Sequence, residues 1–109
     1  MFFSFDGTDG VGKSTQIELF KNWLANNGHE VLLCRDPGST ELGERLRDLL
    51  LQKHDIAIDR RSEMFLYMTA RTQMVEEVIK PALAAGTTVI CDRFLLANIV
   101  YQGHAGGME

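Results

Sequence analysis

The sequence predicts an α/β fold in which a parallel sheet is covered by helices on both faces. Short apolar runs, typical of buried strands, alternate with longer stretches whose apolar residues recur at helical spacing. A glycine-rich loop, Gly7–Ser14, joins the first run to the first helical stretch. It fits the phosphate-binding pattern G-x-x-x-x-G-K-[ST], which needs a strand before it and a helix after it. With 109 residues, the chain has room for one small domain, 1–109.

The first two strands are expected at residues 1–5 and 30–34, on either side of a helix at 14–27. Gly28 stands where helices commonly end, and 35–38 reads as a turn that leaves the second strand. The apolar residues at helical spacing in this helix are Ile17, Phe20, Trp23 and Leu24.

Two further helices follow. Ser39 or Thr40 can cap a short one, and Asp59 can cap a long one. Pro81 is expected to end or kink the long helix after Lys80, because a proline inside a helix has no N–H to donate. One face of the short helix carries Leu42, Leu46, Leu49 and Leu50. One face of the long helix carries Met64, Tyr67, Arg71, Met74, Val75 and Val78.

A third strand is expected at 88–91, with Asp92 and Arg93 at its carboxyl end and another helix at 95–102. Ligands of such sheets bind beyond the carboxyl ends of the strands. The glycine loop, the turn after the second strand and the Asp-Arg pair would therefore converge on one cleft.

The composition is that of an ordinary globular protein, with 45% apolar and 24% charged residues. A net charge of −4 without any basic run argues against a nucleic-acid partner, and no apolar stretch is long enough to span a membrane. Cys34 and Cys91 lie at the ends of apolar runs, so we interpret them as buried free thiols in a reducing cytoplasm. A disulfide or a metal pair remains the alternative.

The glycine loop predicts binding of a nucleoside triphosphate with Mg²⁺. Backbone N–H groups and the helix N-terminus attract phosphates, Lys13 adds a full positive charge, and Ser14 offers a hydroxyl to the metal. The expected phosphate-binding residues are Gly7, Thr8, Asp9, Gly10, Val11, Gly12, Lys13, Ser14 and Thr15. An ordinary flexible turn would be the alternative.

Several motifs, in order and with compatible spacing, resemble those of the thymidylate kinases, which phosphorylate dTMP to dTDP with ATP and Mg²⁺. The resemblance runs through Phe5–Gln16, Arg35–Thr40 and Phe65–Arg71, and continues through Val78–Leu83, Asp92–Phe94 and Tyr101–Gly103. It covers nearly the whole chain and implies a parallel-sheet fold of the nucleoside monophosphate kinase type.

The resemblance implies that Asp9 accepts a hydrogen bond from the 3′-hydroxyl and that Tyr67 stacks on thymine beside Arg71. Arg93 would hold the dTMP phosphate, and Asp92 would lie near the metal. From the residues alone, Asp9 could instead stabilise its loop, Tyr67 could be a core aromatic, and Asp92–Arg93 could be an ion pair. The implied catalytic residues are Asp9, Lys13 and Arg93, and the implied metal ligands are Ser14 and Asp92. The implied dTMP-binding residues are Asp9, Arg35, Pro37, Tyr67, Arg71, Arg93, Asn98, Tyr101 and Gln102.

The chain departs from the family pattern at single positions and in length. Asp36 stands where the family commonly has glutamate, and Ala97 where it commonly has serine. Family members are considerably longer, so we expect a fragment that ends after three of five strands, without the lid. The first strand would then have an unpaired apolar edge, and the piece would fold poorly alone. The resemblance also implies a homodimer packed through helices of this half.

Two other functions remain open. A deoxynucleoside kinase would accept thymidine, although Arg35 and Arg93, a basic pair, favour a monophosphate. A nucleotide-binding switch or assembly module would act on a partner instead. The Asn-Lys-x-Asp element for guanine is missing from the sequence, and no Asp-x-x-Gly switch element follows the second strand. No arginine lies inside the phosphate loop, so a family member of this kind would draw its catalytic arginines from the lid.

Overall fold

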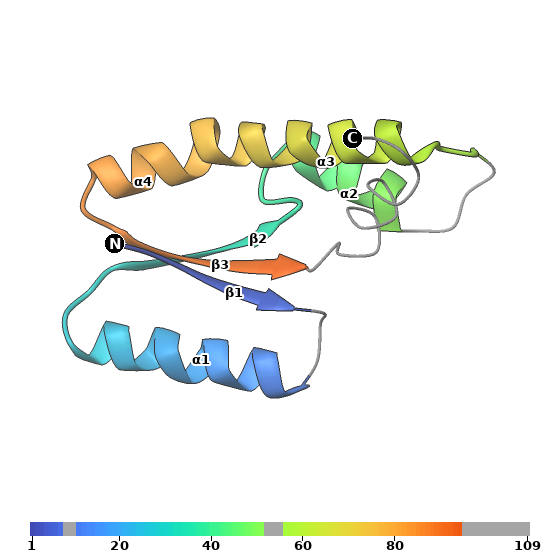
Figure 1. Ribbon diagram of the computed structural model, residues 1–109. Helices are drawn as coiled ribbons and strands as arrows, with labels where there is room; N and C mark the ends of the chain where they lie inside the picture. Colours follow the sequence, from blue (N-terminus) through green and yellow to red (C-terminus); the bar gives the residue numbers. More distant parts are fainter. Residues whose placement is uncertain (8–10, 52–55, 95–109) are drawn as a thin grey trace.

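The computed structural model describes residues 1–7, 11–51 and 56–94. Three parallel strands form one sheet in the order β1-β3-β2, with β1 at Phe2–Gly7, β2 at Val31–Asp36 and β3 at Thr88–Phe94. Helix α1 (Val11–Asn26) lies on one side of the sheet (Figure 1). On the other side lie α3 (Arg60–Met74) and α4 (Lys80–Ala84), with α2 (Glu41–Leu51) packed against α3. The predicted α/β fold is confirmed.

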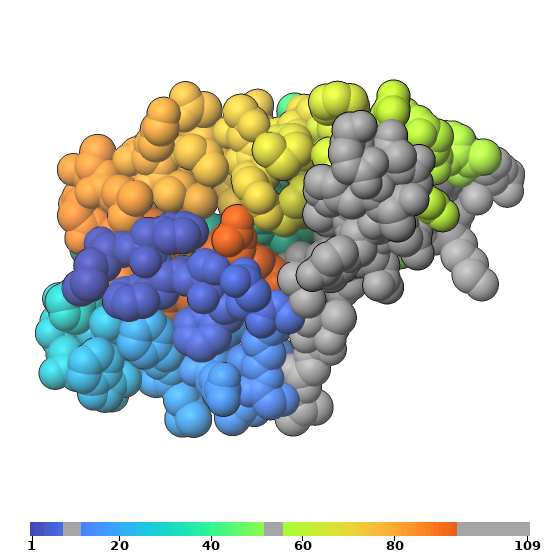
Figure 2. Space-filling view, viewed as in Figure 1, coloured from blue at the N-terminus to red at the C-terminus, as the bar shows by residue number. Residues whose placement is uncertain are grey.

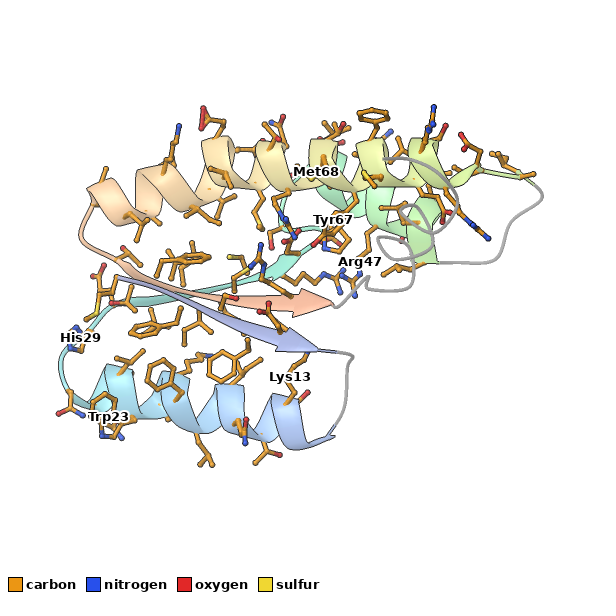
Figure 3. All side chains as sticks on the ribbon, viewed as in Figure 1. Lys13, Trp23, His29, Arg47, Tyr67 and Met68 are labelled. Atoms are coloured by element: carbon orange, nitrogen blue, oxygen red, sulfur yellow. The ribbon has the colours of Figure 1, made fainter. Side chains whose placement is uncertain are left out.

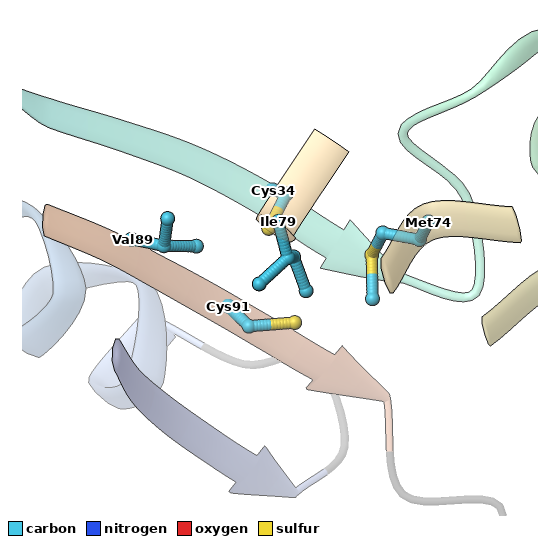
Figure 4. Close-up of a cluster of buried hydrophobic side chains, with 5 residues drawn as sticks. All are labelled: Cys34, Met74, Ile79, Val89 and Cys91. Atoms are coloured by element: carbon cyan, nitrogen blue, oxygen red, sulfur yellow. The ribbon is translucent and has the colours of Figure 1, made fainter. Parts of the chain in front are cut away.

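Each face of the sheet has its own apolar cluster. Towards α1, the buried residues are Ile17, Leu24 and Ile90, with Phe5, Phe20 and Val31 packed against them. Towards the long helix, they are Cys34, Met74, Ile79, Val89 and Cys91 (Figure 4). In the space-filling view, β1 lies on the visible surface between these two layers (Figure 2).

Cys34 and Cys91 are buried free thiols, as predicted. They face one another across β2 and β3. The hydrogen bond in which the Cys91 thiol donates to Cys34, together with burial, raises the pKa of Cys91. This cysteine is therefore a protonated core residue at neutral pH.

The first helix differs from the prediction at its start and on its surface. It begins at Val11, inside the glycine loop, because the loop turns directly into helix. Trp23, placed by spacing with the apolar face, is 59% exposed, and its ring stacks on Phe20 at 6.2 Å between centroids. In this helix, Ile17 and Leu24 are buried against the sheet, whereas Trp23 lies at the edge of the apolar face.

The caps of α2 and α3 follow the sequence. Thr40, rather than Ser39, caps α2, because its hydroxyl accepts from the Gly43 N–H at 2.8 Å. Ser39 has a positive φ of 68° and instead bonds the backbone of Arg35. Asp59 caps α3 by accepting from two backbone N–H groups of its first turn.

Pro81 was predicted to end or kink the long helix after Lys80, and the structure shows that the helix does not end there. Helical turns continue from Arg60 to Ala84 through a π-helical turn at Val75–Ile79. The Lys80 N–H bonds the carbonyl of Val75, five residues back, so the backbone is already wound more widely when it reaches the proline. A widened turn accommodates the missing N–H without a break.

All three strands extend further at their carboxyl ends than predicted, and β2 includes Arg35 and Asp36, which were predicted in the turn. Charged residues therefore lie inside the sheet. Asp92 pairs with Arg35, and Arg93 pairs with Asp36, on neighbouring strands. Because paired residues of parallel strands point to the same face and successive residues alternate, each pair lies on a different face. Arg35 and Asp92 point towards the α1 side, and Asp36 and Arg93 point towards α3.

Candidate active site

On the α1 side, Lys13 is held over the carboxyl ends of two strands. Its Nζ lies 2.7 Å from Asp92 Oδ1, and it donates to the carbonyls of Gly7 at 2.9 Å and Arg93 at 3.5 Å. The side chain of Lys13 is 10% exposed and that of Asp92 is 29% exposed. The structure thus brings the lysine of the glycine loop to the acidic residue of β3, as the convergence of segments predicted. Figure 3 shows Lys13 between α1 and the sheet.

On the α3 side, one buried carboxylate gathers three predicted site residues. Asp36 is fully buried, and its Oδ2 accepts from the Tyr67 hydroxyl at 3.3 Å, Arg71 Nε at 2.8 Å and Arg93 Nε at 3.3 Å. Among the described residues, Oδ1 is buried with no hydrogen-bond partner. Arg93 Nη1 also lies 3.8 Å from Asp6 of β1. We call Asp36, Tyr67, Arg71 and Arg93 the Asp36 cluster.

Tyr67 and Arg71 lie one helical turn apart and contact each other. The Arg71 guanidinium lies 4.5 Å from the centre of the Tyr67 ring, and it also donates to the phenol oxygen. Tyr67 is only 8% exposed. Burial, and the nearby charge of Asp36, raise the pKa of Tyr67, so the phenol remains a proton donor at neutral pH. Figure 3 shows Tyr67 between the long helix and the sheet.

Arg35 does not lie beside Arg93. It pairs with Glu44 of α2, through Nε at 3.1 Å and through a second contact of the same guanidinium. Glu44 also accepts from the Ser39 N–H at 2.8 Å, and the hydrogen bond from Arg35 keeps the pKa of Glu44 below its usual value. These side chains line an open pocket of about 350 Å³, whose walls are Leu33, Cys34, Arg35, Ser39, Glu44 and Asp92.

The turn after β2 holds Pro37, which follows Asp36 through a cis peptide bond. The Pro37 carbonyl accepts from Arg47 Nη1 at 2.8 Å. Gly38 has a φ of 138°, a backbone conformation that residues with a side chain rarely adopt, and a Cβ there would also crowd the Glu44 carboxylate. The turn therefore favours glycine. Two contacts from α2 therefore fix the backbone that carries the buried carboxylate.

The sequence did not single out Asp36, Glu44 or Arg47 as site residues. Asp36 carried a usable signal, since an acidic residue in the last position of an apolar parallel strand lies where such sheets bind ligands. Glu44 and Arg47 carried none, because charged residues on an amphipathic helix usually face solvent.

Some predicted site residues lie outside the described part of the chain: Thr8, Asp9, Gly10, Asn98, Tyr101 and Gln102. The predicted helix at 95–102 lies there too. Gly12, Ser14 and Thr15 lie in the first turns of α1, which starts at Val11. Among the described residues, no three His, Cys, Asp or Glu side chains cluster as a ready-made metal site, and no helix is long and apolar enough to cross a membrane.

Comparison with known proteins agrees with this geometry. The family model for thymidylate kinase matches residues 5–109. A thymidylate kinase of Rhodopirellula baltica is 51% identical over 97% of this chain and 43% of its own length. One from Desulfovibrio desulfuricans is 45% identical over the whole chain and 50% of its own length. The chain thus spans about half the length of these curated relatives.

Solved structures agree as well. The crystal structure of a thymidylate kinase from Ehrlichia chaffeensis matches with a TM-score of 0.78 and 38% identity, over the whole of this chain and 61% of that one. The glycine loop, the three-stranded sheet and the sequence matches over residues 5–109 lead to one assignment: the chain belongs to the thymidylate kinase family.

Proposed function

We propose that this chain supplies the phosphate loop and the dTMP side of an enzyme that transfers a phosphoryl group from ATP to dTMP. The observation that carries the proposal is the meeting of two charged groups at one end of the sheet. Lys13 and Asp92 come from the α1 side, and the Asp36 cluster comes from the α3 side. Donor and acceptor would thus approach each other across the ends of β1 and β3.

Lys13 and the loop amides serve the ATP side. In the free chain the lysine charge is balanced by Asp92 at 2.7 Å, so phosphate oxygens would replace or share that contact. Ser14 and Asp92 would hold Mg²⁺, since a hydroxyl and a partly exposed carboxylate beside the loop are the hard oxygen donors that this ion prefers. When bound, the ion would neutralise charge on the phosphates.

Arg93, Tyr67 and Arg71 serve the dTMP side. Arg93 has its guanidinium at the carboxyl end of β3 and would bind the acceptor phosphate, where a fixed cation also stabilises charge during transfer. Tyr67 would stack on thymine and Arg71 would hydrogen-bond it. Because Tyr67 is 8% exposed with Arg71 over its ring, the arginine must shift before a base can stack. Asp9, Arg35, Pro37, Asn98, Tyr101 and Gln102 complete the proposed dTMP site.

We further propose a homodimer in the cytoplasm, with no nucleic acid or membrane partner. Phe65 and Met68 leave apolar area on α3 for a second copy to cover, and the buried free thiols suit a reducing compartment.

Ligand choice separates this proposal from its alternatives. The experiment uses a completed enzyme, in which residues 1–109 are joined to the part of the Rhodopirellula baltica relative that lies beyond the match. Isothermal titration calorimetry would measure binding of dTMP, thymidine and ATP with Mg²⁺. A dTMP kinase binds ATP and dTMP, and it binds thymidine at least tenfold more weakly. Preference for thymidine would indicate a deoxynucleoside kinase, and indifference to both acceptors would indicate a switch module.

A further inference from the structure

Asp36 occupies an unusual position in this chain. It is the only buried charged residue among those described, and it lies at the end of an edge strand. A buried carboxylate is unfavourable unless cations and hydrogen-bond donors compensate it. Here the compensation comes from Tyr67 and Arg71 of α3 and from Arg93 of β3.

All three donors converge on the same oxygen atom. The two guanidinium Nε atoms lie 2.8 Å and 3.3 Å from Oδ2, so two positive groups are held close together by a single negative one. Without that charge the arginines would repel each other, and each would regain its rotamer freedom. The orientation of both arginines therefore depends on Asp36.

Asp36 is itself held from outside the cluster. The backbone just after it is fixed by the contact of Arg47 with the Pro37 carbonyl and by that of Glu44 with the Ser39 N–H. Its position is thus set by α2, while its carboxylate acts on α3 and β3. The carboxylate thus ties the end of β2 to side chains of both α3 and β3.

We propose that Asp36 is the positioning residue of the dTMP site, which aims Arg93 at the acceptor phosphate and keeps Tyr67 and Arg71 in place for the base. This inference rests on the proposed function and extends it. Asp36 does not contact the reacting atoms. It acts through the three side chains that Oδ2 holds, so their preorganisation, rather than the chemical step, depends on it.

The surroundings of the two carboxylate oxygens allow a substitution that separates the charge of Asp36 from its shape. Asn has almost the same shape as Asp, and its amide oxygen can take the place of Oδ2. Its NH₂ group would then occupy the place of Oδ1, where no hydrogen-bond donor of the described residues stands in the way. Asp36→Asn therefore removes the charge and leaves the packing nearly unchanged.

The test measures KM for dTMP and for ATP, together with the thermal transition, in the completed enzyme. In Asp36→Asn we expect the dTMP KM to rise about tenfold or more, as for loss of one charged hydrogen bond, while the ATP KM stays within about twofold. Asp36→Glu keeps the carboxylate and should recover part of the lost dTMP affinity. Asp6→Asn is the matched control: it removes an exposed carboxylate 3.8 Å from the same arginine and should change neither KM by more than about twofold.

Three results would overturn the inference. An unchanged dTMP KM with a lower thermal transition would make Asp36 a structural residue only. A lower dTMP KM would mean that its charge competes with the substrate phosphate. An Asp36→Glu variant as weak as Asp36→Asn would mean that shape matters rather than charge. A parent enzyme that does not use dTMP would contradict the proposed function instead, so the two failures are distinguishable.

Discussion

Each positively charged side chain that the structure describes in the proposed site forms an ion pair with a carboxylate of the chain itself. Lys13 contacts Asp92, Arg35 contacts Glu44, and Arg71 and Arg93 both contact Asp36. A bound phosphate must therefore replace or share an existing ion pair, so the gain in binding is the difference between two favourable contacts. Each variant is predicted from the contact that it removes.

Lys13→Ala in the completed enzyme should lower kcat by roughly a hundredfold or more. Its effect on dTMP binding should be far smaller. The lysine charge would act on the ATP phosphates as negative charge shifts between donor and acceptor, and loss of one such contact costs about this much in acyl-transfer enzymes. Steady-state kinetics with both substrates would measure it. An unchanged kcat with only a raised ATP KM would contradict the role in transfer.

Tyr67→Leu should raise the dTMP KM more than it lowers kcat, because a stacking surface binds substrate and product alike. Tyr67→Phe serves as the control: it keeps the ring and removes the hydroxyl with its hydrogen bonds to Asp36 and Arg71. If Tyr67→Leu loses its thermal transition while dTMP affinity is unchanged, the tyrosine is a core residue, as its 8% exposure allows.

The positions of some of these side chains in the site could be predicted from the sequence, and those of others could not. Lys13, Tyr67, Arg71 and Arg93 stand in motifs or at helical spacing, so their neighbourhood follows from local geometry. The place of Arg35 depends on strand alternation: once β3 extends through Asp92, its register turns Arg35 away from Arg93. Long-range pairing of this kind is not encoded by spacing within one segment.

At the scale of the elements, α2 packs closely against the turn after β2. A Cβ on Gly43 would lie 2.7 Å from the Gly38 carbonyl oxygen and 2.9 Å from the Thr40 hydroxyl. We expect Gly43→Ala to lower the free energy of unfolding by about 1–3 kcal/mol despite alanine's better helix propensity, because backbone must move to admit the methyl group. Urea unfolding would measure this change, and a more stable variant would show that α2 is free to shift.

The exposed side of α3 predicts self-association. Phe65 is 67% exposed and Met68 47% exposed, and both lie on the long helix. We expect the completed enzyme to sediment as a dimer at micromolar concentration, and Phe65→Glu with Met68→Glu to sediment as a monomer. Leu83→Glu, on α4 of the same long helix and 37% exposed, is the control and should remain a dimer. A parent that sediments as a monomer would contradict this interface.

The order of helices and strands could be predicted from the sequence, whereas the local change from α-helix to π-helix could not. The caps at Thr40 and Asp59 are local hydrogen bonds that a short motif can specify. The π-helical turn before Pro81 could not be predicted in this way, because it is a compromise between the proline and the packing of Met74 and Ile79 on the sheet.

In the molecule as a whole, β1 is an edge strand that precedes the glycine loop. Among the described residues it pairs with β3 alone. Phe2 is 43% exposed although strands of such sheets are usually covered on both faces. The relatives contain about as many residues again beyond the matched region. We therefore expect the 109-residue chain to bind substrates poorly by itself.

The most direct test of the proposed function is formation of dTDP from ATP and dTMP, measured by a coupled assay for ADP and by ³¹P NMR. We expect the completed enzyme to produce dTDP, and residues 1–109 alone to produce none above background. Arginines supplied to a transferring phosphoryl group can be worth a factor of about 10³ or more, and the family resemblance places them in a lid beyond this chain. Turnover by the 109-residue chain within tenfold of the completed enzyme would contradict the need for that second half. A completed enzyme that releases no dTDP would contradict the proposed function.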